Sequence, residues 1–397
     1  FYSLEPESLK LETFTKEGDV DFDLSAEQRA MQKMMRDFVA REVIPNVDKW
    51  EEKEELPRST FKKLADLGLF GMAAPEEYGG MPLDALTSAI IYEELMRGYR
   101  GLSYLAVHNL CLSIIARFGH PEQKQRWVPP LAKGELFGAF AITEPGAGSD
   151  AAAIRTSAKR EGDEYVLNGT KIFISCGGEA DVYIVSTKTD REKAAKGISA
   201  IVVEKGTPGF AAGKTEKKLA MRAYPTRELI FDNCRVPANN LIGEENAGFK
   251  ILMAGLDGGR INVGAGAVGN AQAAFDIALK YAKERVQFGQ PIANFQAIQF
   301  MLADMATEIQ AARLLVYYAA SLKDRGLPVT LAASMAKRYA TDMAMKVTVD
   351  AVQILGGYGV MQDYKVERYM REAKIGQIVE GTNQIQRLVI ARELLRS

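Results

Sequence analysis

One carboxylate near the end of the chain stands in a sequence suited to proton transfer. Glu380 comes directly before Gly381, Thr382 and Asn383, with apolar residues ahead of it and a helical apolar pattern behind it. Glycine adopts backbone angles that other residues avoid, and threonine or asparagine can cap the helix that follows. The pattern predicts a tight turn between two helices, on which Glu380 leans against apolar neighbours. A carboxylate that loses hydration has a raised pKa and can accept a proton near neutral pH.

The same stretch has a plainer interpretation, in which Glu380 is a turn residue that interacts only with a helix dipole. Two loops rich in small residues, 141–150 and 353–359, favour a ligand site, because exposed backbone N–H groups can approach a planar ring or a phosphate. Neither loop has the spacing of a Walker loop or of GxGxxG after a strand. Residues 285–289 combine a cation, an aromatic ring and a glycine, which is also typical of a capped helix end.

Two consecutive glycines interrupt a helical pattern at 257–260, in the sequence Asp-Gly-Gly-Arg. Each glycine costs a helix about 1 kcal/mol. Their presence indicates that something packs closely against the backbone there.

Composition bounds the class of protein. The 397 residues suffice for two or three domains, and 47% hydrophobic with 25% charged residues is ordinary for a globular protein. A net charge of −1 gives no electrostatic footprint of nucleic-acid binding, and no uninterrupted apolar run approaches the ~20 residues of a membrane span. Three scattered cysteines and two histidines predict neither a metal site nor a disulfide framework, which fits a reducing compartment. Because the sequence starts at Phe1, any targeting peptide is expected upstream.

The pattern of apolar residues changes twice along the chain. We expect an N-terminal extension at 1–24, a helical domain at 25–136, a central β-domain at 137–247 and a C-terminal helical bundle at 248–397. Helices are predicted at 83–98, 102–118, 121–134, 248–284, 294–325 and 330–355, and again after Glu380. Strands are predicted at 137–142, 156–160, 164–167, 171–175, 182–187, 198–203 and 228–236, with a hairpin at Asn168-Gly169. The fold class is therefore mainly α, with a small central β-barrel or sandwich and an antiparallel bundle.

Several of these stretches together resemble the acyl-CoA dehydrogenase family, flavoenzymes that desaturate acyl-CoA thioesters. The matching sequence motifs, in chain order, are LSAEQRAMQ, APEEYGG, ITEPGAGSD, NGTKIFIS, VPANNLIGEENAGFK, LDGGRI, ERVQFGQPIANFQ, QILGGYG and VEGTNQIQR. The resemblance runs from about Leu24 to Leu395. The text of AVHNLC, KGISAIVVEKGTPGF and LDGGRIN is most similar to short- and branched-chain members, especially isobutyryl-CoA dehydrogenases.

The resemblance implies FAD, held between the β-domain, the bundle and a neighbouring subunit. It assigns to the flavin the residues Phe140, Ile142, Thr143, Gly148, Ser149, Phe173, Ile174, Ser175, Arg285, Phe288, Gln296, Gln353, Gly356, Gly357, Thr382 and Gln384. Many members have Trp-Ile-Thr where this chain has Phe173-Ile174-Ser175, so the hydroxyl and the aromatic face are kept while the indole N–H is lost.

For the substrate, the resemblance implies that the CoA thioester faces Ser149, Asp257, Gly258, Gly259, Arg260 and Arg392. Glu380 matches the catalytic base. Some members carry the base on the LDGGR helix instead, at the position of Gly259, which has no side chain to act as one. Val379 stands where many members have tyrosine, which changes the shape of the pocket.

The implied activity is α,β-dehydrogenation of a short- or branched-chain acyl-CoA to the trans-2-enoyl-CoA, with electrons passed to an electron-transferring flavoprotein. The implied assembly is a homotetramer, a dimer of dimers, in the mitochondrial matrix of a eukaryote or the cytoplasm of a bacterium. Three alternatives stay open: a medium-chain or other acyl-CoA substrate, oxygen as the electron acceptor, and a non-catalytic assembly or scaffold member that has lost the base.

Overall fold

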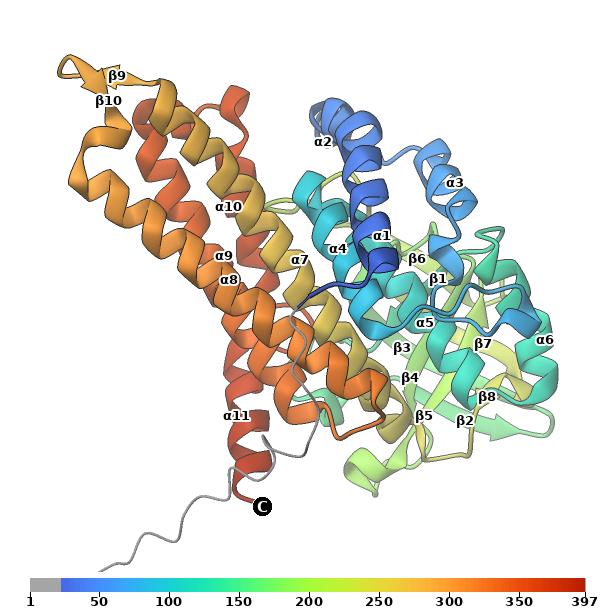
Figure 1. Ribbon diagram of the computed structural model, residues 1–397. Helices are drawn as coiled ribbons and strands as arrows, with labels where there is room; N and C mark the ends of the chain where they lie inside the picture. Colours follow the sequence, from blue (N-terminus) through green and yellow to red (C-terminus); the bar gives the residue numbers. More distant parts are fainter. Residues whose placement is uncertain (1–22, 397) are drawn as a thin grey trace, which may run out of the picture.

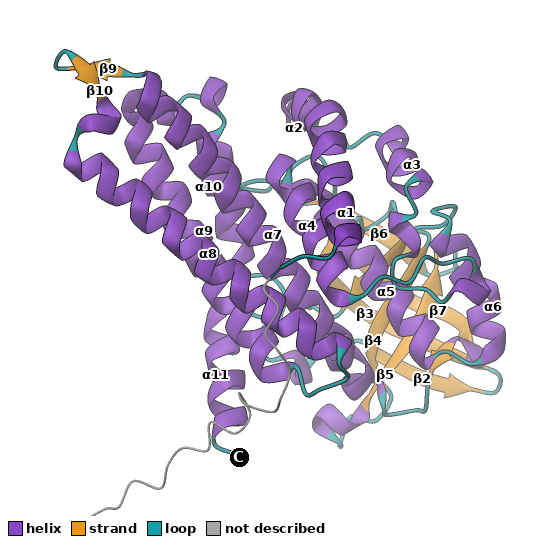
Figure 2. Cartoon of the chain, viewed as in Figure 1, coloured by secondary structure: helices purple, strands orange, loops and turns teal. Residues whose placement is uncertain are grey.

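The computed structural model describes residues 23–396, so the predicted extension at 1–24 lies almost wholly outside the described residues. Figure 1 shows two lobes, with the long helices of the C-terminal half on one side and the N-terminal helices and the sheet on the other. Figure 2 shows that the strands gather in the second lobe, beneath helices α5 and α6. The expected order of helices, strands and helices is confirmed.

The N-terminal helices begin at a cap that the sequence predicts. Ser25 accepts from the N–H of Gln28 at 3.2 Å, and the Gln28 side chain accepts from the N–H of Ser25 at 3.0 Å, which forms a capping box. The helices of this region are α1 (Ala26–Phe38), α2 (Val47–Lys53), α3 (Arg58–Asp66), α4 (Ala85–Gly98), α5 (Tyr104–Phe118) and α6 (Pro121–Ala132), with a 3₁₀ turn η6 (Arg100–Ser103) before α5.

One helical stretch of the described residues, Arg100–Phe118, is long and apolar enough to cross a membrane by length and composition alone, with a mean hydropathy of 1.3. The rest of the chain buries 67% of this stretch, as it does in the core helix of a folded domain.

The central strands form one hydrogen-bonded sheet that folds over on itself. They are β1 (Gly138–Ala141), β2 (Ser157–Glu161), β3 (Glu164–Ser175), β4 (Val182–Lys188), β5 (Ile198–Glu204), β6 (Phe210–Thr215), β7 (Thr226–Pro237) and β8 (Leu241–Ile242). Their order is β6-β7-β3-β2-β4-β5-β8, with β1 beside β4. The half that ends in β2 is paired to the half that begins with β4 where Ser157 faces Lys188. The rings of Tyr183 and Phe210, from β4 and β6, lie 5.0 Å apart, so the halves face each other across a common core.

The predicted hairpin at Asn168-Gly169 is wrong. β3 runs through this dipeptide, and the register shifts between Leu167 and Gly169. A Cβ on Gly169 would lie 2.7 Å from Cα of Thr156, so the glycine permits a close approach of two strands rather than a chain reversal. The reversal between β2 and β3 contains Gly162, at φ 64°. Strands β6 and β8 were not predicted, because β6 is half exposed and β8 spans two residues.

The C-terminal half is a set of long packed helices. They are α7 (Gly248–Glu284), α8 (Gln296–Asp324), α9 (Thr330–Leu355), α10 (Val366–Gly376) and α11 (Asn383–Leu394), and the predicted bounds of α7 and α9 are confirmed. Helix α10 is the helix expected before the Glu380 turn, but its bounds were not predicted. A Cβ on Gly269 would lie 1.9 Å from the Glu93 carbonyl oxygen, so α7 packs tightly against α4 and joins the two lobes. The positions of the domain boundaries stay a prediction.

The segment 285–291 is a hairpin rather than a simple helix end. β9 (Val286–Gln287) and β10 (Gln290–Pro291) pair antiparallel, and the two residues between them, Phe288 and Gly289, have φ of 50° and 76°. Positive φ at both central residues matches the twist of a two-residue hairpin. Figure 1 shows this hairpin projecting from the far end of the long helices.

Candidate functional site

Glu380 lies on the predicted turn between two helices. Its φ is 53° and that of Gly381 is 89°, between the end of α10 and the start of α11. Thr382 caps α11 by accepting from the N–H of Ile385 at 3.3 Å. Gln386 donates to the carbonyl oxygens of Glu380 and Gly381 at 3.1 and 3.0 Å, which fixes the turn from inside α11. A non-glycine residue at positive φ is uncommon and is held here by its surroundings.

The Glu380 carboxylate points at the backbone of α7. A Cβ built on Gly259 would lie 2.2 Å from Oε2 of Glu380, so the missing side chain leaves the space that the carboxylate fills. Oε2 is buried without a hydrogen-bond partner among the described residues, although the residue as a whole is half-buried. Burial raises the pKa of Glu380 to about 7, opposed by the positive charges of Arg260, Lys337 and Arg100.

This pKa predicts how the rate of proton abstraction depends on pH. Below pH 7 Glu380 is largely protonated and cannot accept a proton, and above pH 7 it is ionised and can. The rate of substrate-driven flavin bleaching is therefore expected to rise with pH through a midpoint near 7, as measured by stopped flow on both sides of that value. A rate that is constant across this range would contradict the assignment of Glu380 as the titrating base.

A cavity of about 390 Å³ adjoins the base. Its volume suits a small ligand. It lies between α4, α5, α7 and the end of α8, and its lining includes Met72, Tyr92, Asn109, Leu110, Ser113, Gly255, Gly258, Gly259, Asn262 and Lys323. The hydroxyl of Tyr92 and Oδ1 of Asn109 are buried without partners among the described residues, so this end of the cavity is narrow and partly polar.

The predicted substrate residues lie in different places. Gly258 and Gly259 line the cavity. Asp257 and Arg260 pair with each other at 2.7 Å, and Asp257 also accepts from Thr330 at 2.8 Å. Ser149 and Arg392 are exposed, and neither lines the cavity.

The predicted flavin residues of the β-domain lie where the loop after β1 meets β3, because the N–H of Ile172 donates to the Thr143 carbonyl oxygen at 2.9 Å. Phe173 sits in the irregular part of β3 at φ 58° with 61% of its surface exposed, which leaves its ring free to contact a planar ligand. Ile174 is buried, so only its backbone can reach a ligand, whereas Ser175 and Phe140 are half-buried. In the loop after β1, Ile142 and Thr143 are half-buried and Gly148 is exposed.

A buried lysine that sequence reasoning missed holds this loop. Lys171 of β3 is fully buried and donates to the Ile142 carbonyl oxygen at 3.0 Å, to Glu144 at 2.8 Å and to Ser186 at 2.9 Å. Glu144 in turn accepts from the backbone N–H of Arg155 and Thr156 at 2.6 and 2.9 Å. The sequence shows only that Lys171 interrupts an apolar strand pattern two positions before Phe173, and this interruption was the available sign of a buried charge.

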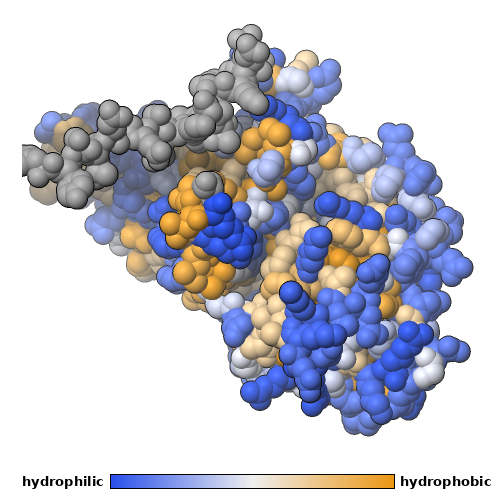
Figure 3. Space-filling model, turned by 90° about the horizontal axis from the view of Figure 1, so that it is seen from below, coloured by the Kyte–Doolittle hydropathy of each residue, from blue (hydrophilic) through white to orange (hydrophobic). Residues whose placement is uncertain are grey.

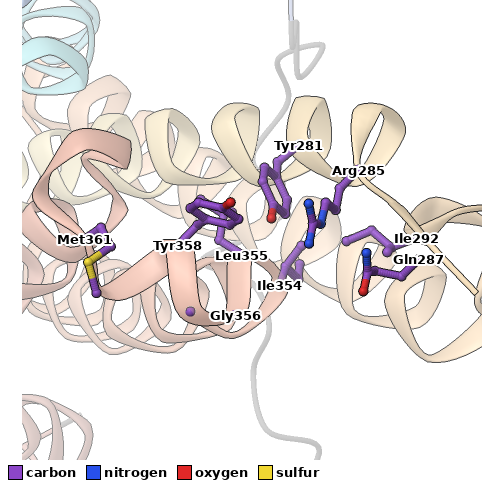
Figure 4. Close-up of a pocket in the computed structure, with 10 residues that line it drawn as sticks. Tyr281, Arg285, Gln287, Ile292, Ile354, Leu355, Gly356, Tyr358 and Met361 are labelled. Atoms are coloured by element: carbon purple, nitrogen blue, oxygen red, sulfur yellow. The ribbon is translucent and has the colours of Figure 1, made fainter.

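A second cavity, of about 490 Å³, lies at the other end of the long helices. Figure 4 shows Tyr281 between Tyr358 and Arg285, and the Arg285 guanidinium lies 5.5 Å from the centre of the Tyr358 ring. Gly356 and Gly357 line the same cavity, and a Cβ on either would have no atom within 4 Å, so the backbone there is open to a ligand.

The two cavities are far apart in one chain. Gly259 and Tyr281 are 22 residues apart on the continuous helix α7, which corresponds to about 33 Å. Thr382 and Gln384 lie close to Glu380 in the chain, whereas Gln296 and Gln353 are exposed residues near the second cavity in the chain, and Phe288 is 94% exposed on the hairpin. The predicted cofactor residues therefore fall in three parts of the chain, the β-domain, the Glu380 turn and the region of the second cavity, and the last two are far apart.

Comparison with known proteins identifies the class. Family models for the N-terminal, middle and C-terminal domains of acyl-CoA dehydrogenases match residues 25–135, 139–234 and 246–395. The chain therefore belongs to the acyl-CoA dehydrogenase family, whose members are flavoprotein oxidoreductases that act on CH–CH groups.

Individual relatives cover almost the whole chain. A short-chain specific acyl-CoA dehydrogenase of Clostridium acetobutylicum is 48% identical, over 95% of this chain and 100% of its own. Mitochondrial isobutyryl-CoA dehydrogenase of Bos taurus is 45% identical, over 95% of this chain and 91% of its own. A chain in the structure described as the electron transferring flavoprotein of Acidaminococcus fermentans is 50% identical, with a TM-score of 0.93, over 95% of this chain and 100% of that one.

The residues present fit the flavin that the family uses. Phe173 offers an exposed aromatic face, the loop after β1 offers open backbone at Gly146 and Gly148, and the Arg285 cavity offers a cation beside open glycines. Among residues 23–396, no three His, Cys, Asp or Glu side chains gather as metal ligands, and all three cysteines are buried and free.

Proposed function

We propose that this chain catalyses the α,β-dehydrogenation of a short- or branched-chain acyl-CoA thioester, with Glu380 as the base. The observation that carries this proposal is the buried, unpartnered carboxylate oxygen of Glu380, which lies against Gly259 in the lining of a cavity. A carboxylate with a pKa of about 7 is matched to proton transfer near neutral pH.

The reaction removes a proton from the α-carbon and a hydride from the β-carbon, and leaves a double bond between them. Glu380 accepts the α-proton on its carboxylate. FAD, when bound, accepts the hydride and so supplies the oxidising power. Negative charge develops on the thioester carbonyl oxygen as the α-proton leaves, and hydrogen-bond donors must stabilise it. We assign one of these donors to the backbone N–H of Glu380, which the strained turn holds in place.

The cavity supports a short acyl group. Tyr92, Met72 and Leu110 occupy its walls, and polar atoms of Tyr92 and Asn109 lie at one end, where an apolar chain offers them no hydrogen bond. The names of the relatives in Clostridium acetobutylicum and Bos taurus, short-chain and isobutyryl, agree with this size.

A panel of acyl-CoA thioesters with a dye as electron acceptor tests the substrate class. Butyryl- or isobutyryl-CoA is expected to give the highest kcat/KM, because a longer apolar chain would lie against the polar atoms of Tyr92 and Asn109 without a hydrogen bond to them. Octanoyl- or palmitoyl-CoA as the best substrate would overturn the size assignment and favour a longer-chain enzyme. FAD-loaded protein that reacts with none of them would favour a scaffold member.

The two-cavity geometry supports a homo-oligomer, a dimer of dimers. A ligand bound beside Glu380 does not reach the Arg285 cavity of the same subunit, which lies about 33 Å away along α7. A second copy placing its Arg285 and Phe288 against the first would complete each flavin site, and closed symmetry is the usual outcome of such reciprocal contacts. Exposed apolar residues of α11 and its C-cap, among them Leu388 and Leu395, point to further contacts, and orange patches mark the underside toward which α11 runs (Figures 1 and 3).

We also propose that an electron-transferring flavoprotein reoxidises the enzyme, in the mitochondrial matrix of a eukaryote or the cytoplasm of a bacterium. The similar chain in the Acidaminococcus fermentans structure supports the partner, and the mitochondrial relative of Bos taurus supports the first compartment.

A further inference from the structure

A fully buried lysine on α9 holds the turn that carries the base. The side chain of Lys337 has no exposed surface, and its Nζ donates to the Gly381 carbonyl oxygen and to Oδ1 of Asn383, each at 2.9 Å. The same Asn383 oxygen accepts from Thr341 at 3.1 Å, and the Asn383 amide donates to Asp342 at 2.6 Å. Three side chains on one face of α9 therefore hold Gly381 and Asn383, two of the three residues that follow Glu380.

The charged and titratable groups around Glu380 come from four elements. They are Arg260 on α7, Lys337 on α9, Arg100 on η6 and Tyr92 on α4. Arg260 forms an ion pair with Asp257, with 2.7 Å between its guanidinium nitrogen and the carboxylate oxygen. Arg100 is also attracted by Glu372, whose carboxylate accepts from its backbone N–H at 3.3 Å.

Lys337 differs from Arg260 because no carboxylate forms an ion pair with its ammonium among the described residues. The nearby carboxylate of Asp342 is engaged by Asn383, by Gln377 at 2.8 Å and by Arg387 at 3.0 Å. Burial lowers the pKa of Lys337 to about 8, and the negative charge that most opposes this shift is that of Glu380. An unpaired buried ammonium is costly, and the ionised base offsets part of this cost.

We propose that Lys337 is a positioning residue for the base: its two hydrogen bonds hold the Glu380 turn against α7, and its charge stabilises the ionised carboxylate. This inference rests on the proposed function of Glu380. It adds a residue that touches neither the cavity nor the reacting atoms and acts only through the turn.

The test compares Lys337→Gln, Lys337→Met and Lys337→Arg in the FAD-loaded protein. Glutamine removes the charge and keeps a donor for the turn, methionine removes both, and arginine keeps the charge. Loss of the cation makes the ionised carboxylate less favourable, so the midpoint of bleaching rate against pH is expected to move upward by about 1 unit in the Gln and Met variants. The Arg variant is expected to keep the wild-type midpoint.

Amide hydrogen exchange of residues 378–386 without substrate gives a second readout. Exchange is expected to be faster in Lys337→Met than in the wild type, because the Gly381 carbonyl loses one of its two donors and keeps only Gln386. Lys337→Gln is expected to exchange more slowly than Lys337→Met, because glutamine can still donate to the turn. Lys346→Gln is the matched control: it removes one charge from the same helix at an exposed residue that pairs with Glu308, so neither midpoint nor exchange should change.

A midpoint of bleaching rate against pH that does not move in Lys337→Gln would overturn the proposal. A purely structural contact predicts slower bleaching and faster amide exchange with no shift of the midpoint, and that result would overturn it as well. If Lys337→Met does not fold, the Gln and Arg variants still decide. If wild-type protein reacts with no acyl-CoA, the proposed function fails, while the exchange experiment still shows whether Lys337 holds the turn.

Discussion

Glu380→Gln is expected to abolish dehydrogenation while FAD and acyl-CoA still bind. Glutamine has nearly the shape of glutamate but cannot accept the α-proton. General-base catalysis is worth about 10²–10⁴-fold. Stopped-flow mixing of oxidised protein with its best acyl-CoA measures the rate of flavin bleaching directly.

Glu372→Gln is the matched control, because Glu372 is also a buried glutamate whose pKa burial raises to about 7, on the helix just before the turn. Its carboxylate accepts from Arg100 and Asn270 rather than facing the cavity. We expect lower stability but continued bleaching in this variant. Bleaching of Glu380→Gln within a factor of about ten of wild type, below the usual range, would mean that Glu380 is not the base. Asp257 would then be the next carboxylate to test, although its bonds to Arg260 and Thr330 leave it less free.

The long helices and the turn at Glu380 could be predicted from the sequence because each depends on local signals. The bounds of α7 and α9 follow from sustained apolar periodicity, and the turn follows from a glycine and a capping threonine beside an apolar run. The hairpin at Asn168-Gly169 failed for the opposite reason. The dipeptide signals a reversal locally, but contact of Gly169 with Thr156, the residue before β2, makes it a bulge within β3.

The candidate site shows the same division. The role of Glu380 and of the two glycines of α7 could be predicted from residue type and spacing. The roles of Lys171 and Lys337 could not, because a single lysine in a strand or helix pattern usually faces solvent. Their roles depend on carbonyl oxygens 29 and 44 residues away in the chain, at Ile142 and Gly381, which only the folded structure brings to them.

The contact between α7 and the base leads to the second large effect, which is expected for Gly259→Ala. A Cβ at this position would lie 2.2 Å from Oε2 of Glu380 and 2.9 Å from its Cδ, so the carboxylate must move away from α7. A displacement of about 1 Å at a reacting group can cost on the order of 10²-fold in rate. The helix itself is expected to gain stability, because alanine is better than glycine in a helix by about 1 kcal/mol.

A higher melting temperature together with a much slower bleaching rate is therefore the expected result for Gly259→Ala. The matched control is Gly258→Ala, one residue earlier, where the new Cβ meets only the Nζ of Lys323, at 2.7 Å. Lys323 lies at the end of α8 and has a flexible side chain that can swing aside, so this variant should share the gain in stability and lose far less rate. Equal rates for the two variants would mean that α7 does not set the position of the base. A loss confined to Gly259→Ala would show why this chain cannot carry a second acid at that position: the carboxylate of Glu380 already occupies the space.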